Sequence, residues 1–275
     1  MGNLNSKLND KVLSKGKDNN LNNNEKINKK YNQMKNEIIM TIKIDENDIN
    51  KDIYFLDNID NEDEKEYIIE GEQYRTIHNK LKEMNESNTY LYINNKKYKF
   101  KKYFNFKNVG EYNVKLKLNF LMKDCSFMFY NCRNIINIDL SNFNTKNIIN
   151  MDRMFSCCEN LIYLNLSNFE TKNVTNMRSL FFGCKKLKNI DLSNFETSKV
   201  KNMKSMFCGC ENLIKLDITN FNTQNINNMS QMFYNCKNLT NINLSNFDTK
   251  NVTKMDNMFC NCENLIKLDL SNFNI

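Results

Sequence analysis

Residues 174–197 read VTNMRSLFFGCKKLKNIDLSNFET, and this stretch decides the fold of the chain. Its first half places apolar residues at the spacing of one helix face, at Val174, Met177, Leu180, Phe181 and Cys184. Its second half carries leucine at residues 187 and 192 and isoleucine at residue 190. The last step, of two residues, is typical of a strand, in which alternate side chains share a face. The stretch therefore predicts a helix, a short strand and a turn at residues 193–195.

The same unit recurs at a constant step of 26 residues through the second half of the chain. A cysteine marks one position of every repeat, at Cys132, Cys158, Cys184, Cys210, Cys236 and Cys262. Two phenylalanine series keep the same step, from Phe129 to Phe259 and from Phe143 to Phe273. Such repetition indicates stacked units, because one unit of this size cannot bury its apolar face alone. We therefore expect side chains 26 positions apart to lie above one another in a continuous interior.

An asparagine also occupies one turn position in all repeats, at Asn142, Asn168, Asn194, Asn220, Asn246 and Asn272. A side-chain amide at a turn can bond backbone groups of the adjacent unit. We favour this structural role over ligand binding.

The repeat can be written N-M-x-x-M-F-x-x-C-x-N-L-x-x-L-x-L-S-N-F-x-T-x-N-V, and residues 203–228 fit it well. This phrase resembles the BspA-like leucine-rich repeat of surface proteins from bacteria and microbial eukaryotes. The resemblance covers about residues 122–275 and implies a leucine-rich-repeat solenoid with a surface or adhesion role and no catalytic residues. Surface members typically carry a secretion signal or a cell-wall anchor, and no apolar run of that kind follows Met1.

Residues 1–36 are rich in asparagine and lysine, with eight lysines against three acidic residues. They cannot bury enough apolar surface to offset the cost of ordering, so we predict a disordered basic arm. The chain begins MGNLNS, which matches M-G-x-x-x-[ST], a motif in which Gly2 accepts a myristoyl chain after removal of Met1. An acyl chain and a basic arm together predict attachment to a membrane surface.

Residues 37–112 predict a small α+β module with the element order ββαββ. Apolar residues at 38–44 and 53–56 indicate two strands, and helical spacing across residues 72–86 indicates a helix that contains His78. Asn94 and Asn95 separate two further apolar runs and indicate a hairpin. The complete fold class is an α/β leucine-rich-repeat solenoid over residues 113–275, with a helix and a short strand per repeat, preceded by this module and the disordered arm.

Composition argues against an enzyme and against metal or cofactor binding. The six glycines are scattered and cannot form a phosphate-binding loop, and His78 is the single histidine. The cysteines lack the C-x-x-C pairing of zinc sites, so we interpret them as reduced, buried apolar residues. No stretch of about 18 apolar residues is present. These features predict a non-enzymatic protein without cofactors.

The strand of each repeat is expected to turn polar side chains outward in parallel columns, and this open face suits a protein partner. The predicted partner-binding residues are Tyr163, Asn165, Asn189, Asp191, Lys215, Asp217, Asn241, Asn243, Lys267 and Asp269. We expect no nucleic-acid partner, because most of the excess positive charge lies in residues 1–36 rather than in the folded part. The chain stops at residues 273–275, just after a strand, and the open edge of this last repeat predicts weak self-association or a partner that covers it.

The sequence therefore predicts a protein–protein interaction scaffold in the cytoplasm, held at the inner face of a membrane. The alternative is an adhesin-like protein of the BspA type at the cell surface, exported by an unrecognised route.

Overall fold

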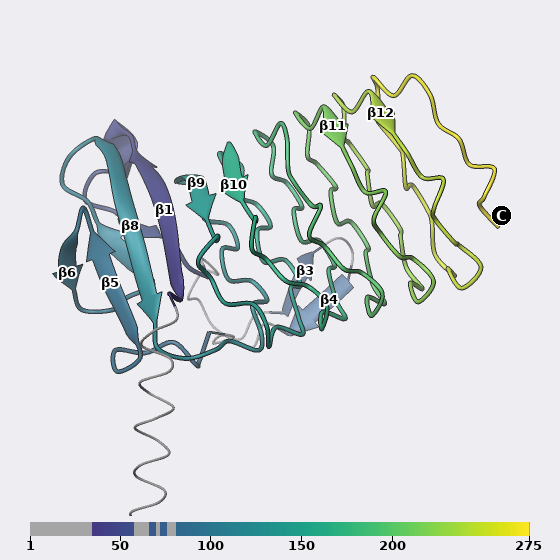
Figure 1. Cartoon of the computed structure of the whole chain (residues 1–275). Helices are drawn as coiled ribbons and strands as arrows, with labels where there is room; N and C mark the ends of the chain where they lie inside the picture. Colours follow the sequence, from purple (N-terminus) through teal and green to yellow (C-terminus); the bar gives the residue numbers. More distant parts are fainter. Residues whose placement is uncertain (1–34, 58–65, 70–71, 76–80, 275) are drawn as a thin grey trace, which may run out of the picture.

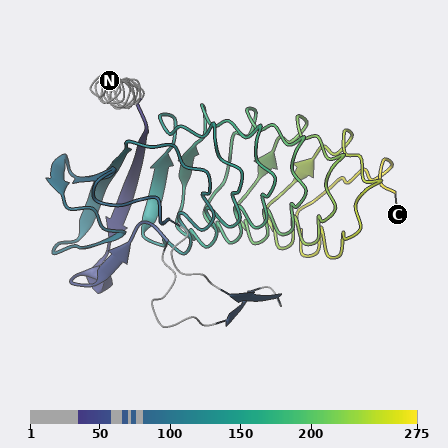
Figure 2. The same ribbon diagram turned by 90° about the horizontal axis from the view of Figure 1, so that it is seen from below.

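A computed structural model describes residues 35–57, 66–69, 72–75 and 81–274 of the chain. A β-sheet unit, here called the cap, is formed by residues 36–57 and 81–122 and lies at one end of a row of coils (Figure 1). The coils follow one another along a single direction as far as residue 274 (Figure 2).

The cap contains strands β1 (Glu37–Ile44), β2 (Asp52–Tyr54), β5 (Thr89–Ile93), β6 (Lys96–Tyr98), β7 (Tyr103–Asn105) and β8 (Gly110–Leu118), and a 3-10 turn η1 (Glu46–Asp48). Strands β3 (Glu66–Ile69) and β4 (Glu72–Arg75) pair with each other in a separate two-stranded sheet. The coils contribute short strands β9 (Ile135–Asp139), β10 (Tyr163–Asn165), β11 (Lys215–Leu216) and β12 (Asn241–Ile242). The main sheet has the order β10-β9-β1-β8-β5-β6, so it contains strands of both the cap and the coils.

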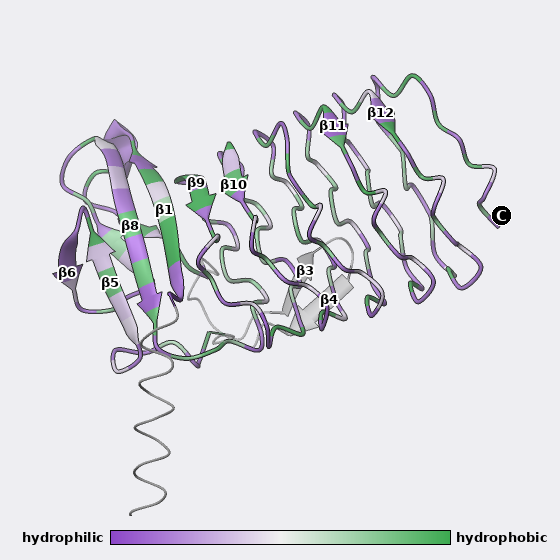
Figure 3. Cartoon of the chain, viewed as in Figure 1, coloured by the Kyte–Doolittle hydropathy of each residue, from purple (hydrophilic) through white to green (hydrophobic). Residues whose placement is uncertain are grey.

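Strand β1 joins the cap to the first coil. Its alternating pattern buries Ile38, Met40 and Ile42 on one face, as expected for a strand with one face on the core. It pairs antiparallel with β8 on one side and with β9 on the other, where Ile39 lies opposite Asp139. Figure 3 shows the same alternation as purple and green bands along β8. The backbone edge of the first coil is therefore covered by a strand that precedes it by about a hundred residues.

The α/β prediction is wrong, because the described residues contain no α-helix and the coils consist of turns and short strands. Along this part of each coil, successive backbone N–H groups donate alternately to a carbonyl of the next coil and to a carbonyl of the same coil. Arg153 N–H donates to the carbonyl of Arg178 in the next coil at 2.9 Å, whereas Met154 N–H donates back to Met151 at 3.2 Å. Arg153 and Cys157 have left-handed φ values of 54° and 60°. A helix would direct every N–H to the residue four positions back within its own turn, which this alternation excludes.

The physical reason for the error lies in the apolar spacing. Met177, Leu180, Phe181 and Cys184 all point into the interior, as predicted, and all are fully buried. Linked turns with one left-handed residue every four positions bring the same side chains inward as a helix would. The spacing therefore identifies the buried residues without identifying the backbone that carries them. The prediction of a leucine-rich-repeat solenoid built from helices and strands is corrected accordingly.

Predictions for the cap have mixed outcomes. The strand at residues 38–44 is confirmed as β1, and the hairpin is confirmed as β5 and β6, joined by Asn94 and Asn95 with φ values of 47° and 66°. Two left-handed turn residues match the right-handed twist of a two-residue hairpin. The helix predicted over residues 72–86 is wrong in its first part, where β4 is a strand, and His78 lies outside the described residues. The described residues of the module form strands, turns and one 3-10 turn, so they do not have the predicted α+β structure.

The arm predicted at residues 1–36 lies almost entirely outside the described residues, but Asn36 belongs to the folded part. Asn36 is buried, and its amide donates to the carbonyl of Phe120 at 2.7 Å. Its side-chain oxygen accepts the N–H of Asn144 at 2.9 Å. These bonds attach the start of β1 to the first coils.

Phenylalanines 26 positions apart stack in one continuous ladder from Phe129 to Phe259, and pairs of the second series also lie in contact, which confirms that equivalent side chains share one interior. Phe207 lies on Phe233 with ring centroids 5.6 Å apart and planes inclined by 3°. In the second series, Phe169 and Phe195 lie 6.0 Å apart. The apolar core is a single cluster that runs from Ile38 in the cap through the coils.

The asparagine column forms the expected bonds between coils. The amide of Asn168 donates to the carbonyl of Ser141 at 2.8 Å, and that of Asn246 donates to Thr219 at 2.6 Å. The structural role that we favoured for these asparagines is confirmed.

A threonine column provides a second polar ladder, which the sequence analysis missed. The Thr197 hydroxyl donates to the carbonyl of Asn222 at 2.9 Å and accepts the N–H of the same residue at 2.8 Å. A single hydroxyl thus satisfies two backbone groups of the next coil. The column consists of Thr145, Thr171, Thr197, Thr223 and Thr249, all of them buried.

Candidate interaction surface

The strand face of the coils holds the ten predicted partner-binding residues in two columns. Nine are exposed, and Asn165 is half-buried. Tyr163 lies in register with Asn137 of the preceding coil, and Lys215 pairs in parallel with Asn241, which in turn pairs with Lys267. The side chains of one column therefore lie directly above one another at the spacing of hydrogen-bonded strands.

The column of aspartates and asparagines is engaged in local turns. Asp217 accepts the N–H of Thr219 at 3.0 Å and its hydroxyl at 2.7 Å, and Asn243 accepts the N–H of Ser245 at 3.0 Å. The bonds from the hydroxyl and the N–H of Thr219 lower the pKa of Asp217. Side chains bound in this way close the turn after each strand and offer fewer free acceptors to a partner.

An exposed apolar column beside these residues was missed by the sequence analysis. Ile162 and Tyr163 are 55% and 56% exposed, and Ile214 and Ile266 occupy the position of Ile162 in every second coil, with Lys188 and Thr240 between them. Ile162 N–H donates to the carbonyl of Ile136 at 2.8 Å, so the column is ordered by backbone bonds between coils. The sequence signal was the isoleucine that directly follows a buried or half-buried leucine before the strand position, at residues 162, 214 and 266.

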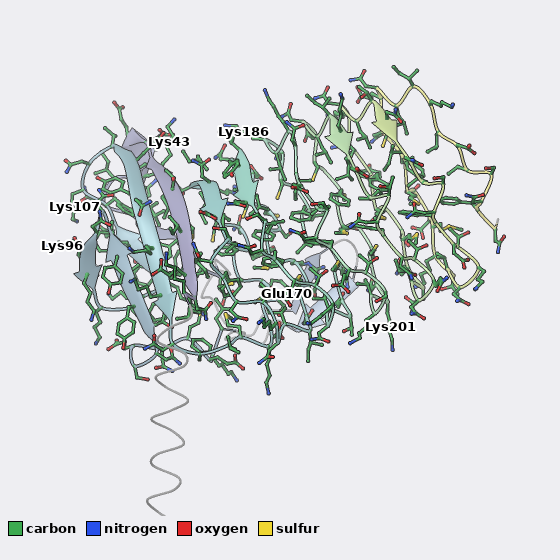
Figure 4. The ribbon with its side chains drawn as sticks, viewed as in Figure 1. Lys43, Lys96, Lys107, Glu170, Lys186 and Lys201 are labelled. Carbon is green, nitrogen blue, oxygen red and sulfur yellow. The ribbon has the colours of Figure 1, made fainter. Side chains whose placement is uncertain are left out.

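A cleft of about 600 Å³ opens where the cap meets the first coils. Residues from β1, η1 and three successive coils line it, among them Lys43, Asp48, Arg133, Asn134, Ile162 and Lys186. Lys43 and Lys186 lie at the same edge of the molecule, whereas Lys201 lies on the opposite side (Figure 4). The cleft thus brings together segments that are far apart in the sequence.

Asn134 holds the two sides of this cleft together. Its amide donates to the carbonyl of Lys43 at 3.0 Å and to the carboxylate of Asp48 at 2.8 Å, and its own carbonyl accepts the N–H of Lys43 at 2.9 Å. This junction fixes η1 beside the first coil.

The rim of the cleft carries charges of both signs. Lys43 lies 3.3 Å from Asp45, and Glu159 lies 3.7 Å from Arg133 and 3.3 Å from Lys185. Exposed ion pairs of this kind contribute little stability, on the order of 0–1 kcal/mol. Their charges remain available to a partner, and the exposed Ile162 gives the cleft an apolar wall.

The cysteines belong to the interior rather than to a site. The Cys158 thiol donates to the carbonyl of Phe129 at 3.0 Å, and burial raises its pKa well above the usual range. Within the part of the chain that the structure describes, no group of three or more histidine, cysteine, aspartate or glutamate side chains could hold a metal ion.

The lipid anchor predicted at Gly2 lies outside the described residues, and neither the coil architecture nor the family match below supports it. Among the described residues, no helix has the length and apolar character needed to cross a bilayer.

The coils match the model of one protein family, described as "Mycoplasma protein of unknown function, DUF285". The match covers residues 123–215 and 211–275, which is the row of coils without the cap. No curated protein and no solved structure matches the chain. The resemblance to BspA-like repeats stays an expectation.

Proposed function

Because the family model spans more than half of its length, the chain belongs to the DUF285 family, and we propose that it is a non-enzymatic recognition protein whose strand face binds a protein partner. The observation that carries this proposal is the exposure of Ile162 and Tyr163, side by side and both more than half exposed, next to the cleft between cap and coils.

Exposed apolar side chains gather on this side of the molecule. Six large apolar side chains are exposed among the described residues, and four of them belong to the strand side: Ile162, Tyr163, Ile214 and Ile266. Adjacent apolar residues with a polar rim are typical of the centre of a protein interface, where tyrosine is enriched. Burial of Ile162 and Tyr163 under a partner would supply apolar contact area.

The charges at the cleft support a specific rather than a general partner. Lys43, Arg133 and Lys186 lie near Asp45 and Asp48, so the cleft presents both signs within one opening. Such a pattern selects partners by complementary charge and excludes those with like charges in the same places.

The coils hold this surface in place before binding. The strand backbones are bonded from coil to coil, and the core beneath them is continuous. A rigid surface loses little conformational entropy on binding, which favours affinity.

A matched set of variants tests the proposal. Full-length wild type, Ile162→Ala, Tyr163→Ala and Ile149→Ala are used as baits, and the retained proteins are quantified by mass spectrometry. Ile149 is the control, because it is 49% exposed and lies in the same column as Lys201, away from the cleft. We expect Ile162→Ala and Tyr163→Ala to lose the same partner and Ile149→Ala to retain it. Equal retention by all three variants would contradict the proposal.

A further inference from the structure

The outer face of the main sheet carries two tyrosines among lysines in the cap. Tyr90 and Tyr92 point away from the core, because the alternate residues of β5, Leu91 and Ile93, are buried. Tyr90 and Tyr92 are half-buried, so part of each side chain remains accessible.

Lysines of the neighbouring strands lie opposite these tyrosines. On β8, Lys117 is opposite Tyr90 and Lys115 is opposite Tyr92, and on β6, Lys97 is opposite Tyr92. The Lys97 ammonium lies 4.7 Å from the centre of the Tyr90 ring. Those of Lys115 and Lys117 lie 5.3 and 5.8 Å from the centre of the Tyr92 ring.

The patch formed by Tyr90, Tyr92, Lys97, Lys115 and Lys117, here called the tyrosine–lysine patch, has a net positive charge. Glu37 on β1 offsets one lysine, since its carboxylate lies 3.1 Å from the Lys117 ammonium. Three cations and this one carboxylate leave an excess that suits an anionic ligand.

The rings of Tyr90 and Tyr92 indicate which class of anionic ligand fits the patch. Alternate residues of a strand are about 6.8 Å apart and point the same way, so Tyr90 and Tyr92 form two platforms in a row. Proteins that bind single-stranded nucleic acid combine such aromatic platforms with positive charges along the backbone path. A sheet face is a common support for this arrangement. An acidic peptide would use the lysines and leave the rings without a role, and a duplex hides the faces of its bases.

The charge distribution along the sequence argued against a nucleic-acid partner, but it did not show these lysines gathered beside two tyrosines. We propose that the tyrosine–lysine patch binds single-stranded nucleic acid, with bases stacked on Tyr90 and Tyr92 and phosphates held by Lys97, Lys115 and Lys117. The lysines now lie over the rings, and a stacking base displaces them toward the phosphates. Because their stems are flexible, this movement needs no change of backbone. A hollow of about 350 Å³ beside Tyr90 and Lys97 continues the path beyond the first ring. Phe100 borders it, and so does Glu86, whose charge is offset by Lys99 at 3.0 Å.

The tyrosine–lysine patch is separate from the proposed protein-binding surface. Tyr92 lies on β5 and Tyr163 on β10, with β8, β1 and β9 between them. Either site can therefore fail its test without affecting the other.

Fluorescence anisotropy with the full-length protein tests the proposal, with a labelled single-stranded thymidine oligonucleotide as the probe. Tyr92→Ala should weaken binding roughly tenfold at every salt concentration, because a stacking platform is lost. Tyr92→Phe should bind like wild type, because phenylalanine keeps the ring. Lys115→Gln should reduce the slope of log affinity against log salt by about 0.7, the value for one phosphate contact on a single strand. Tyr163→Ala is the matched control and should bind like wild type.

Four results would overturn the proposal. They are the absence of binding at micromolar protein in low salt, equal affinity for a duplex of the same length, wild-type binding by Tyr92→Ala, and an unchanged salt slope for Lys115→Gln. Wild-type binding by Tyr92→Ala would place the contact elsewhere, such as in the lysines of residues 1–36. Anionic phosphatidylserine vesicles form a parallel arm, and binding to vesicles without binding to the oligonucleotide would identify a membrane surface as the ligand. Circular dichroism checks the folding of each variant, and if Tyr92→Ala does not fold, the Lys115→Gln slope decides.

Discussion

Phe155 lies over Phe181 with ring centroids 5.5 Å apart and ring planes inclined by 7°. The same relationship continues from Phe181 to Phe207 at 5.5 Å. Phe181 is therefore covered on both faces by rings of the adjacent coils, and the coils depend on one another for burial.

Replacement of one ring should strongly destabilise the coils. Phe181→Ala removes a fully buried side chain between two others and leaves a cavity, at a cost of about 3–5 kcal/mol in the free energy of unfolding. Urea denaturation measures this change. Phe182→Ala is the control, because Phe182 is half-buried and should cost less. Equal losses in the free energy of unfolding for the two variants would show that a ring in the ladder stabilises the coils no more than a half-buried ring outside it.

The threonine ladder should contribute through hydrogen bonds rather than through packing. Thr197→Val keeps the shape of the side chain but leaves the N–H and carbonyl of Asn222 without the Thr197 hydroxyl. We expect a loss of about 1–3 kcal/mol in the free energy of unfolding, measured by urea denaturation. Ser198→Ala, at the exposed neighbouring position, should change it little. A neutral Thr197→Val would refute the role of the hydroxyl.

The asparagine column should stabilise the stack more weakly, because it is exposed. Asn194→Ala removes the bond from its amide to the carbonyl of Ser167 and should lower the melting temperature. The expected cost is about 0.5–1.5 kcal/mol. Asn189→Ala, at an exposed position of the strand face, is the control and should leave the melting temperature nearly unchanged. If Asn194→Ala also left the melting temperature unchanged, the structural role of this asparagine would be contradicted.

Acid should weaken the turns that follow the strands. Hydrogen bonds from Ser193, Thr219 and Ser271 lower the pKa values of Asp191, Asp217 and Asp269 from the usual 3.8. A carboxylate with a lowered pKa in the folded state contributes stability that is complete above its unfolded value and is lost as the pH falls below it.

A triple variant isolates this effect. Asparagine accepts the same bond without titrating, as Asn243 does from Ser245. Replacement of the three aspartates by asparagine should therefore reduce the fall in urea midpoint between pH 6 and pH 3, because these values lie on either side of the usual pKa of 3.8. If the urea midpoint of the triple variant fell as much as that of wild type, the acid sensitivity would arise from other titrating groups.

The thiols should divide into fast and slow classes toward a thiol reagent such as Ellman's reagent. Cys260 is exposed, whereas Cys158 is buried and its pKa is raised by burial. Because the thiolate is the reactive form, Cys260 should react at once in native protein and Cys158 only on unfolding. Cys260→Ser should remove a fast phase that Cys158→Ser leaves intact. Rapid reaction of Cys158 would mean that the interior opens readily.

The repeat of 26 residues was sufficient to predict which side chains are buried, that equivalent ones stack, and that Asn168 and its equivalents bond the adjacent coil. These properties follow from periodicity, since any backbone that repeats every 26 residues brings the same positions together. The polar columns of the strand face were predicted for the same reason, because side chains alternate along a strand.

The path of the backbone required three-dimensional contacts. A helix and linked turns both bury Met151, Met154 and Cys158, and the carbonyl of Arg178 in the next coil, as the acceptor for Arg153, decides between them. The pairing of β1 with β9 and the position of Asn134 between Lys43 and Asp48 likewise join segments about a hundred residues apart. Periodicity describes which equivalent positions of successive repeats are neighbours. It does not predict hydrogen bonds between a strand outside the repeats and the first coil. The cleft, the exposure of Ile162 beside it and the sheet that joins cap and coils could therefore be identified only from the tertiary structure.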